Sequence, residues 1–311
     1  MDWRIDHARA DPRPFPPSVR VEVKALACEL PASSGVPLSR WSAAEVAREV
    51  MEQGLVAKIS GSTVWRWLSE EAIRPFYHRS WIFPRDPNFA HKAGRVLDLY
   101  EGRWAGEPLG AQEYVISSAD EKTSIQARSR CHPTLSCSED RPVRVEHEYE
   151  RKGALAYLAA WDVHRARLFG RCEPKNGIEP FGRLVEQVMR EEPYASADRV
   201  FWIVDNGSSH RGKRSVRRLE GEWPNLRLIH LPTHASWLNQ IEIYFSVVQR
   251  KVLTPNDFAD LDILAERLIA FQERYERVAE PFAWKFTRRD LDRLLDRLTE
   301  HRSSLSSSAA A

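Results

Sequence analysis

Apolar residues between positions 41 and 80 recur at the spacing of α-helices. The first predicted helix has a single buried face, made of Ala43, Val46, Ala47, Val50 and Met51. Ser60 can cap a second helix, with Ile59 packing onto Val64. That helix would bury Val64, Trp67 and Leu68 and would expose Ser62, Thr63, Trp65 and Arg66. This pattern fits a helix-turn-helix, whose second helix enters the major groove of DNA, and it fits a plain helical hairpin equally well.

After about residue 112 the pattern changes to short apolar runs that predict strands alternating with helices. Strands are predicted at 113–118, 154–161, 166–172, 200–204 and 226–231, and helices at 180–190, after 205, at 239–252, at 261–275 and at 287–302. Val200–Val204 is entirely apolar, as is typical of a strand buried on both faces. The expected fold is α/β, with a mixed sheet flanked by helices and sites at the strand ends.

The remaining segments are expected to connect or flank these two domains. Residues 1–40 are predicted to be an irregular arm with one short helix near residues 20–30, followed by the helix-turn-helix domain at 41–80. Residues 81–111 form a linker with a helix that starts at Asp86-Pro87 and reaches Tyr100. The sheet domain then covers 112–302, and the Ser/Ala-rich residues 303–311 are predicted to be a disordered tail.

The composition indicates where the protein is located in the cell, but it does not indicate its activity. Lys and Arg (46) nearly balance Asp and Glu (44), so the net charge of +2 neither requires nor excludes a nucleic-acid partner. The segment His210–Arg218 is locally basic, which fits a solvated helix face or a contact with nucleic acid. Four scattered cysteines indicate reduced thiols, and the longest apolar run, Ala154–Trp161, is too short to span a bilayer. We therefore expect a cytoplasmic protein without a membrane partner.

Three acidic residues lie at positions where they could bind metal ions for the cleavage of phosphodiesters. Asp120 follows the first predicted strand, Asp205 follows the all-apolar strand, and Glu242 lies at the edge of a buried helical stripe. Each also has a structural explanation, because Asp120 and Asp205 suit turns and Glu242 could form a capping box with Asn239. Together they can converge on two Mg²⁺ ions, because hard cations prefer carboxylate oxygens. The sheet order would place Asp120 and Asp205 on neighbouring strands.

The segments around these acids resemble the three signature blocks of bacterial transposases of the insertion-sequence-630 group, which are relatives of the mariner transposases. The blocks are Asp120-Glu121-Lys122-Thr123, Asp205-Asn206 with His210 following, and Pro232-Thr233-His234-Ala235-Ser236-Trp237-Leu238-Asn239-Gln240-Ile241-Glu242. The third block is the most specific, because eleven consecutive residues match in kind and order. The 36 residues between Asp205 and Glu242 are also close to the spacing of that group.

The resemblance implies a DDE-type catalytic domain with an RNase H-like fold and a helix-turn-helix domain before it. It implies that Asp120, Asp205 and Glu242 are the catalytic residues and bind two Mg²⁺ ions, with Mn²⁺ as a substitute. The residues expected to support that site are Lys122, Asn206, His210, His234 and Asn239. The residues expected to contact DNA are Ser62, Thr63, Arg66, Arg211, Lys213 and Arg214.

The implied reaction is DNA cleavage at the ends of a mobile element, followed by strand transfer into target DNA, commonly at TA. The implied partners are double-stranded DNA with terminal inverted repeats and a second copy of the chain, in a bacterial cytoplasm and at the nucleoid when bound to DNA. Because the group usually has two helix-turn-helix units, we expect the other unit to be encoded separately or lost. Two alternatives stay open: a non-catalytic DNA-binding regulator of its own element, and an RNase H-like nuclease that does not join strands.

Overall fold

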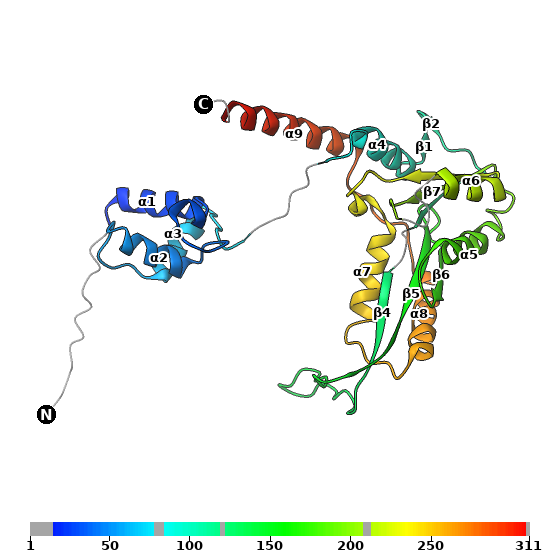
Figure 1. Cartoon of the computed structure of the whole chain (residues 1–311), viewed down its shortest axis with the longest axis horizontal. Helices are drawn as coiled ribbons and strands as arrows, with labels where there is room; N and C mark the ends of the chain where they lie inside the picture. The colour runs from blue at the N-terminus through cyan, green and yellow to red at the C-terminus, as the bar shows by residue number, and fades with distance from the viewer. Residues whose placement is uncertain (1–14, 78–83, 119–121, 208–212, 309–311) are drawn as a thin grey trace. The chain divides into compact units, whose positions relative to one another are not determined.

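The structure is a computed structural model that describes residues 15–77, 84–118, 122–207 and 213–308, with the backbone alone described at 122, 123, 213 and 301–308. The chain divides into two compact units, Met1–Ile82 and Phe83–Ala311 (Figure 1). Within the described residues, no helix is long and apolar enough to cross a membrane.

The first unit is a bundle of three helices and one short 3-10 helix. These are α1 (Pro17–Cys28), η1 (Pro31–Ser34), α2 (Ala43–Glu52) and α3 (Gly61–Glu70). All three α-helices contribute to one core, with Val23 and Leu26 from α1, Val46 and Val50 from α2, and Val64, Trp67 and Leu68 from α3. The inward faces predicted for α2 and α3 are confirmed, and Ser60 caps α3 by accepting a hydrogen bond from Thr63 N at 3.2 Å.

The boundary predicted at residue 40 is wrong, because α1 is part of this bundle. Trp41 explains the continuity: it is 1% exposed and its Nε1 donates to Glu29 O at 3.0 Å, just beyond the end of α1. The segment between α1 and α2 is therefore fixed to both helices. The Pro and Ser residues of this segment suggested an irregular arm. The apolar side chains of α1 nevertheless pack onto the apolar faces of α2 and α3, and this burial holds α1 in the bundle.

Removing the cap of α2 is expected to destabilise the first unit by about 1 kcal/mol. Ser42 Oγ accepts from Glu45 N at 3.2 Å while Ser42 N donates to Glu45 Oε2 at 2.9 Å, so both halves of a capping box are present. Ser42→Ala should therefore speed amide hydrogen exchange across α2. Ser69→Ala, an exposed position late in α3, is the control and should leave exchange unchanged. Equal effects of the two changes would contradict the capping role.

The second unit is built on a six-stranded mixed sheet. Its elements are α4 (Phe89–Tyr100), β1 (Arg103–Trp104), β2 (Glu107–Pro108), β3 (Glu113–Ser118), β4 (Lys122–Ser129), β5 (Glu150–Asp162), β6 (Leu168–Glu173), α5 (Ile178–Met189), β7 (Arg199–Val204), α6 (Lys213–Glu222), β8 (Leu226–His230), η2 (Ser236–Leu238), α7 (Ile241–Lys251), α8 (Leu261–Glu276) and α9 (Arg288–Ser308). The strand order is β4-β5-β3-β7-β8, with β6 also paired to β5. β3, β7 and β8 are parallel to one another, whereas β5 is antiparallel to its neighbours.

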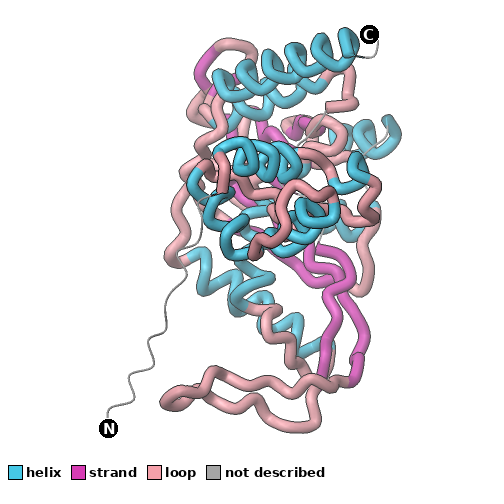
Figure 2. The backbone as a smooth tube through the Cα atoms, turned by 90° about the vertical axis from the view of Figure 1, so that its left-hand side faces the viewer, coloured by secondary structure: helices cyan, strands magenta, loops and turns pink. Residues whose placement is uncertain are grey.

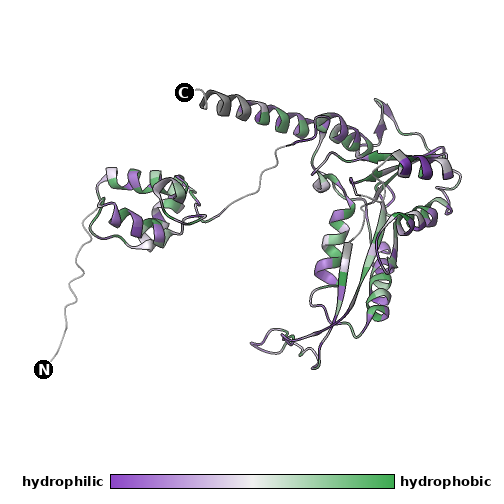
Figure 3. Cartoon of the chain, viewed as in Figure 1, coloured by the Kyte–Doolittle hydropathy of each residue, from purple (hydrophilic) through white to green (hydrophobic). Residues whose placement is uncertain are grey.

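Alternating side chains of the central strands form two separate cores on the two faces of the sheet. On β5, Tyr157 and Trp161 join a core with α4, α7 and α8, whereas Leu158 and Ala160 join one with α5 and α6. The period of two along a strand produces this division. The unit therefore has three layers, helices–sheet–helices, as Figure 3 also shows by the hydrophobic colouring of the strands between the helices.

Three predictions about this unit need correction. Strand β4 was not expected, and it pairs with residues 150–157 of β5 to form a ribbon that extends from the sheet toward a long loop (Figure 2). Helix α4 begins at Phe89, two residues beyond the predicted Asp86-Pro87 start, because Pro87 and Asn88 form a turn in which Asp86 Oδ1 accepts from Asn88 N at 2.9 Å. Helix α9 continues to Ser308, so residues 303–308 are helical rather than a disordered tail. Extending an existing helix costs little compared with starting one.

Candidate active site

The carboxyl ends of β3, β7 and β8 meet at one edge of the sheet, because the three strands are parallel. Ile116 pairs with Trp202 and Ser117 with Ile203, so the last residues of β3 and β7 lie side by side. The predicted adjacency of the strands that precede Asp120 and Asp205 is thus confirmed. Asp120 itself lies outside the described residues, between Ser118 at the end of β3 and Lys122 at the start of β4. The side chain of Lys122 is also outside the described part.

Asp205 follows β7 directly and is half-buried. Its Oδ1 accepts a hydrogen bond from Gly207 N at 3.0 Å, which turns the chain away from the sheet. Asn206 donates from Nδ2 to Leu231 O at 2.8 Å, while Leu231 N donates to Val204 O at 2.9 Å. These bonds fasten the second signature block to the residue that follows β8. The next described element is helix α6, so Asp205-Asn206-Gly207 does not close a hairpin.

Glu242 is the second residue of α7 and is half-buried. The capping box with Asn239 is wrong: the helix starts after Gln240, and no side chain of the preceding residue caps it. Asn239 is 1% exposed, and both ends of its amide bind the end of β3, with Oδ1 accepting from Ser117 Oγ at 2.5 Å and Nδ2 donating to Ser118 O at 2.9 Å. Glu242 is therefore not engaged as a capping partner of Asn239. The third block is tied instead to the strand that leads to Asp120.

Two further residues hold this edge together, and the sequence identified them only as the ends of a predicted helix. Tyr100, at the end of α4, donates from its hydroxyl to Leu238 O at 2.7 Å and accepts from Gln240 N at 3.3 Å. Burial raises the pKa of Tyr100 well above its usual range, so the hydroxyl keeps its proton. Asp86 Oδ2 accepts from Thr233 N at 3.1 Å and from Lys92 Nζ at 2.8 Å. Asp86, just before α4, thus holds the first part of the loop between β8 and α7, and Tyr100, the last residue of α4, holds its end.

Asp86→Asn is expected to lower the free energy of unfolding of the second unit by about 1–2 kcal/mol near pH 7. Burial alone would raise the pKa of Asp86, but the hydrogen bonds from Lys92, Thr233 and Asn88 outweigh it and lower the pKa below 3.8. Because the folded pKa lies below the unfolded one, this contribution is complete above about pH 4. It is lost as the pH falls through the folded pKa. Urea unfolding should show a smaller difference between wild type and variant at pH 3 than at pH 7; an equal difference at both would contradict the charge effect.

The histidines and basic residues predicted near the site are spread over two loops. His234 is exposed and has a left-handed backbone, with φ of 61°, in the loop between β8 and η2. His210 and Arg211 lie outside the described residues, as does the side chain of Lys213, the first residue of α6. Arg214 is exposed on α6, together with Arg217 and Arg218. Figure 3 shows α6 as one of the most hydrophilic helices of the unit.

In the first unit, the face of α3 opposite its core carries the residues predicted to contact DNA. Ser62 and Arg66 are exposed and Thr63 is half-buried. The Ser60 hydroxyl lies 2.9 Å from the hydroxyls of both Ser62 and Thr63. Trp65 is 56% exposed on the same helix, which is unusual for so large an apolar side chain. The exposed face predicted from the sequence is thus observed, whereas no described contact tests its DNA-binding role.

A metal ion would find hard oxygen ligands at this sheet edge. Asp205 and Glu242 both offer carboxylates that are half-buried, a setting in which divalent cations such as Mg²⁺ bind. Among the residues that the structure describes, no group of three or more His, Cys, Asp or Glu side chains could hold an ion. The third acid of the predicted set is Asp120, which is not among them. The carboxylate oxygens of Asp205 and Glu242 are the kind of ligand that a divalent metal ion takes.

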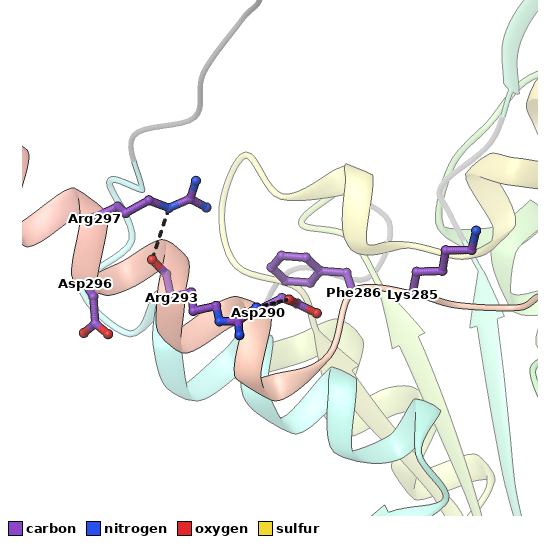
Figure 4. Close-up of a pocket in the computed structure, with 6 residues that line it drawn as sticks. All are labelled: Lys285, Phe286, Asp290, Arg293, Asp296 and Arg297. Carbon is purple, nitrogen blue, oxygen red and sulfur yellow. Dashed lines mark hydrogen bonds and ion pairs between the residues drawn. The ribbon is translucent and has the colours of Figure 1, made fainter.

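A pocket of about 790 Å³ lies beside the third block (Figure 4). It is formed by the end of the segment after α8 and by the first turns of α9, and its lining residues are Lys285, Phe286, Asp290, Arg293, Asp296 and Arg297. Phe286 packs edge-on against Trp237, with ring centroids 5.1 Å apart, so the block and this pocket share a wall. Neither Asp205 nor Glu242 lines it. The charges around it are mixed, and we assign it no catalytic part.

Comparison with known proteins agrees with this architecture. Residues 115–265 match the family model described as DDE superfamily endonuclease. The Mos1 mariner paired-end complex with Mn is similar in structure, with a TM-score of 0.52 at 14% identity over 92% of this chain and 78% of that chain. The Mos1 strand transfer complex gives a TM-score of 0.51 at 14% identity, over 94% and 79% of the two chains. No curated protein sequence matches the chain.

These likenesses confirm the predicted fold class, an RNase H-like mixed sheet flanked by helices with a helical unit before it. They do not distinguish the insertion-sequence-630 group from other proteins with this fold. The matched segment begins in β3 and ends in α8, so it includes all three signature blocks. Residues 115–265 are thus similar to the DDE superfamily endonuclease domain, and the chain has a fold similar to that in the Mos1 mariner complexes.

Proposed function

We propose that the protein is a transposase that cleaves DNA at the ends of a mobile element and joins them to target DNA, with Asp120, Asp205 and Glu242 as its catalytic carboxylates. The observation that carries the proposal is that the second and third signature blocks are both fastened to strand ends at one sheet edge. Asn206 fixes the second block to the residue after β8, and Asn239 fixes the third block to the end of β3, the strand that leads to Asp120. The similarity to the DDE superfamily endonuclease domain supports this chemistry at the edge.

The three carboxylates would hold two Mg²⁺ ions, with Mn²⁺ as a substitute. Bound divalent metal neutralises phosphate charge and stabilises both the attacking and the leaving oxygen. The carboxylates of Asp205 and Glu242 approach from a strand end and a helix start, both rigid elements, which favours a fixed ligand geometry. Lys122, His210 and His234 would orient the DNA backbone or the ligands. Hydrolysis of one phosphodiester would free a 3′-hydroxyl. Its oxygen would then form a new phosphodiester at a phosphorus of the target strand, while that strand's own 3′-oxygen leaves and becomes a 3′-hydroxyl.

We further propose that α3 binds the inverted repeats of the element and that α6 binds the DNA backbone near the site. Exposed Ser62, Arg66 and Trp65 suit contacts to a DNA groove, with Thr63 beside them. Arg211, Lys213 and Arg214 begin a basic segment directly after Asp205. The similar Mos1 complexes contain paired ends and strand-transfer products, which supports DNA as the partner. A homodimer, a TA target and a place at the bacterial nucleoid complete the proposal.

Purified protein mixed with labelled DNA that carries the element's ends tests the function. Cleavage that needs Mg²⁺ or Mn²⁺, followed by products joined to a second DNA, is the expected result. Binding without any strand break would identify a regulator instead, and cleavage without joined products would identify a nuclease. Either outcome would contradict the proposal that the protein is a transposase.

Replacing Arg214, Arg217 and Arg218 together by Gln is expected to weaken DNA binding most strongly at low salt. Each lost phosphate contact should lower the slope of log affinity against log salt concentration by about 0.9, or by up to about 2.7 for three. The matched control replaces Arg267, Arg274 and Arg277, which are equally exposed on or next to α8. The control should keep the wild-type slope. A similar loss of slope in both variants would show that only net charge matters.

A further inference from the structure

The first N–H group of α7 is bound by a residue of the sheet, whereas the next two N–H groups are bound by the backbone carbonyls of Asn239 and Gln240. The opening N–H groups of a helix need acceptors, which a side chain just before the helix usually supplies. Gln240 occupies that position and its side chain caps nothing. Ile241 N donates instead to Ser117 Oγ at 3.1 Å, on strand β3. Strand β3 therefore closes the N-terminus of α7.

The same serine hydroxyl makes a second bond in the opposite direction. Ser117 Oγ donates to Asn239 Oδ1 at 2.5 Å, and Asn239 Nδ2 donates to Ser118 O at 2.9 Å. Ser117 and Ser118 are 0% exposed and Asn239 is 1% exposed, so water does not compete for these bonds. The three bonds form a cross-link between the last two residues of β3 and the start of α7. Apolar residues would fill the same space without this directionality.

The cross-link joins the two chain segments that carry the first and third acids. Ser118 lies two positions before Asp120, and Ile241 lies directly before Glu242. We propose that Ser117 and Asn239 are positioning residues, which hold the Glu242 turn at a fixed place on the strand end that leads to Asp120. The inference rests on the proposed function, because it assigns the held geometry to the metal ligands. Neither residue is proposed to touch metal or DNA.

The test compares Ser117→Ala with a matched loss of a hydroxyl elsewhere on the same helix. Tyr244→Phe is the control, because the Tyr244 hydroxyl joins α7 to β5 through Tyr157, with the two oxygens 2.9 Å apart and away from the capped turn. Ser117→Ala should raise the Mn²⁺ concentration for half-maximal cleavage by about 10- to 100-fold, as loss of ligand-orienting partners does. DNA affinity should not change, and excess Mn²⁺ should restore cleavage. Ser117→Thr, which keeps the hydroxyl, should restore the wild-type metal requirement.

Hydrogen exchange gives a readout that does not depend on activity. In Ser117→Ala the amide of Ile241 should exchange at least about tenfold faster, since it loses its acceptor. Tyr244→Phe should leave this amide at the wild-type rate. If Ser117→Ala does not fold, Tyr100→Phe removes a neighbouring hydroxyl from Leu238 O and Gln240 N and should change metal requirement and exchange in the same direction.

Two results would overturn the inference. One is an unchanged metal requirement in Ser117→Ala; the other is an equal rise in Tyr244→Phe, which would indicate general loosening of α7. A wild-type protein that neither binds Mn²⁺ nor cleaves DNA would instead overturn the proposed function and the metal part of the inference with it. Exchange at Ile241 would still decide in that case whether Ser117 holds the turn.

Discussion

Asp205→Asn is expected to lower the rate of DNA cleavage by at least about 1000-fold, or about 4 kcal/mol of transition-state stabilisation. The substitution keeps the size of the side chain, and an amide oxygen can still accept the bond from Gly207 N. What it removes is the negative charge that a divalent cation requires of a ligand at the end of β7. Single-turnover cleavage of end-containing DNA measures the effect, with DNA affinity determined in parallel and expected to be unchanged or tighter.

The control lies at the opposite end of the same strand. Asp198 is exposed just before β7, so Asp198→Asn makes the same chemical change where the sheet offers no site. Cleavage by this variant should match the wild type. Comparable loss in both variants, or cleavage by Asp205→Asn within tenfold of the wild type, would remove Asp205 from the reaction.

The largest expected effect on stability follows from Trp161→Ala, at about 3–5 kcal/mol for the second unit. Trp161 is 0% exposed in the middle of the sheet and stacks at 4.6 Å on Phe282, with Tyr275 of α8 at 6.4 Å. Truncation leaves a cavity between β5 and the segment that crosses it after α8. Urea unfolding of wild type and variant gives the difference in the free energy of unfolding.

Trp161→Phe separates the ring from its N–H group. Among the residues that the structure describes, the buried Nε1 atom of Trp161 finds no hydrogen-bond partner, so the tryptophan itself carries a desolvation cost. Phe removes that cost together with part of the ring, and we expect a loss of only about 1 kcal/mol. A loss as large as that of Trp161→Ala would mean that the indole, and not general packing, stabilises this part of the core.

Helices and central strands could be predicted because burial imposes a period on their sequences. Val200–Val204 is apolar throughout because β7 lies in the middle of the sheet with helices on both faces, and α3 exposes Ser62 and Arg66 because only one side of it is covered. Strand β4 has no such pattern. Its sequence Lys122–Ser129 is largely polar, and it lies at the sheet edge. Its register shifts twice against β5, and Ser124, with a left-handed backbone, lies within the first shift.

Only those residues of the candidate site that belong to a sequence motif could be predicted. The strand ends beside Asp205 follow from the order of apolar runs, and the third block identified the segment that contains Glu242. Ser117 gave no signal, because a serine in a buried strand is commonplace and its partner is 122 residues away. Asn239 suggested a capping box from its spacing to Glu242, but tertiary hydrogen bonds to Ser117 and Ser118 use its side chain instead.

Asp86 also makes a tertiary contact that its local sequence pattern did not predict. Asp-Pro before an apolar stripe is a good sequence signal for the start of a helix, and Asp86 Oδ1 does accept from Asn88 N just before α4. Its Oδ2 also holds Thr233 N, which the local pattern did not predict. Local patterns describe neighbours along the chain, whereas this bond joins residues 147 positions apart. Residues that support a site through such contacts are found from the fold alone.

The most direct test of the central claim, that Asp120, Asp205 and Glu242 form one metal site, is a crystal structure of the protein bound to end DNA and soaked in Mn²⁺. Anomalous scattering should place Mn²⁺ at the carboxyl ends of β3 and β7, with carboxylate oxygens of Asp205, Glu242 and Asp120 at about 2 Å. Mn²⁺ bound by other residues, or carboxylates of Asp205 and Glu242 too far apart to serve one cluster in the DNA complex, would contradict the account.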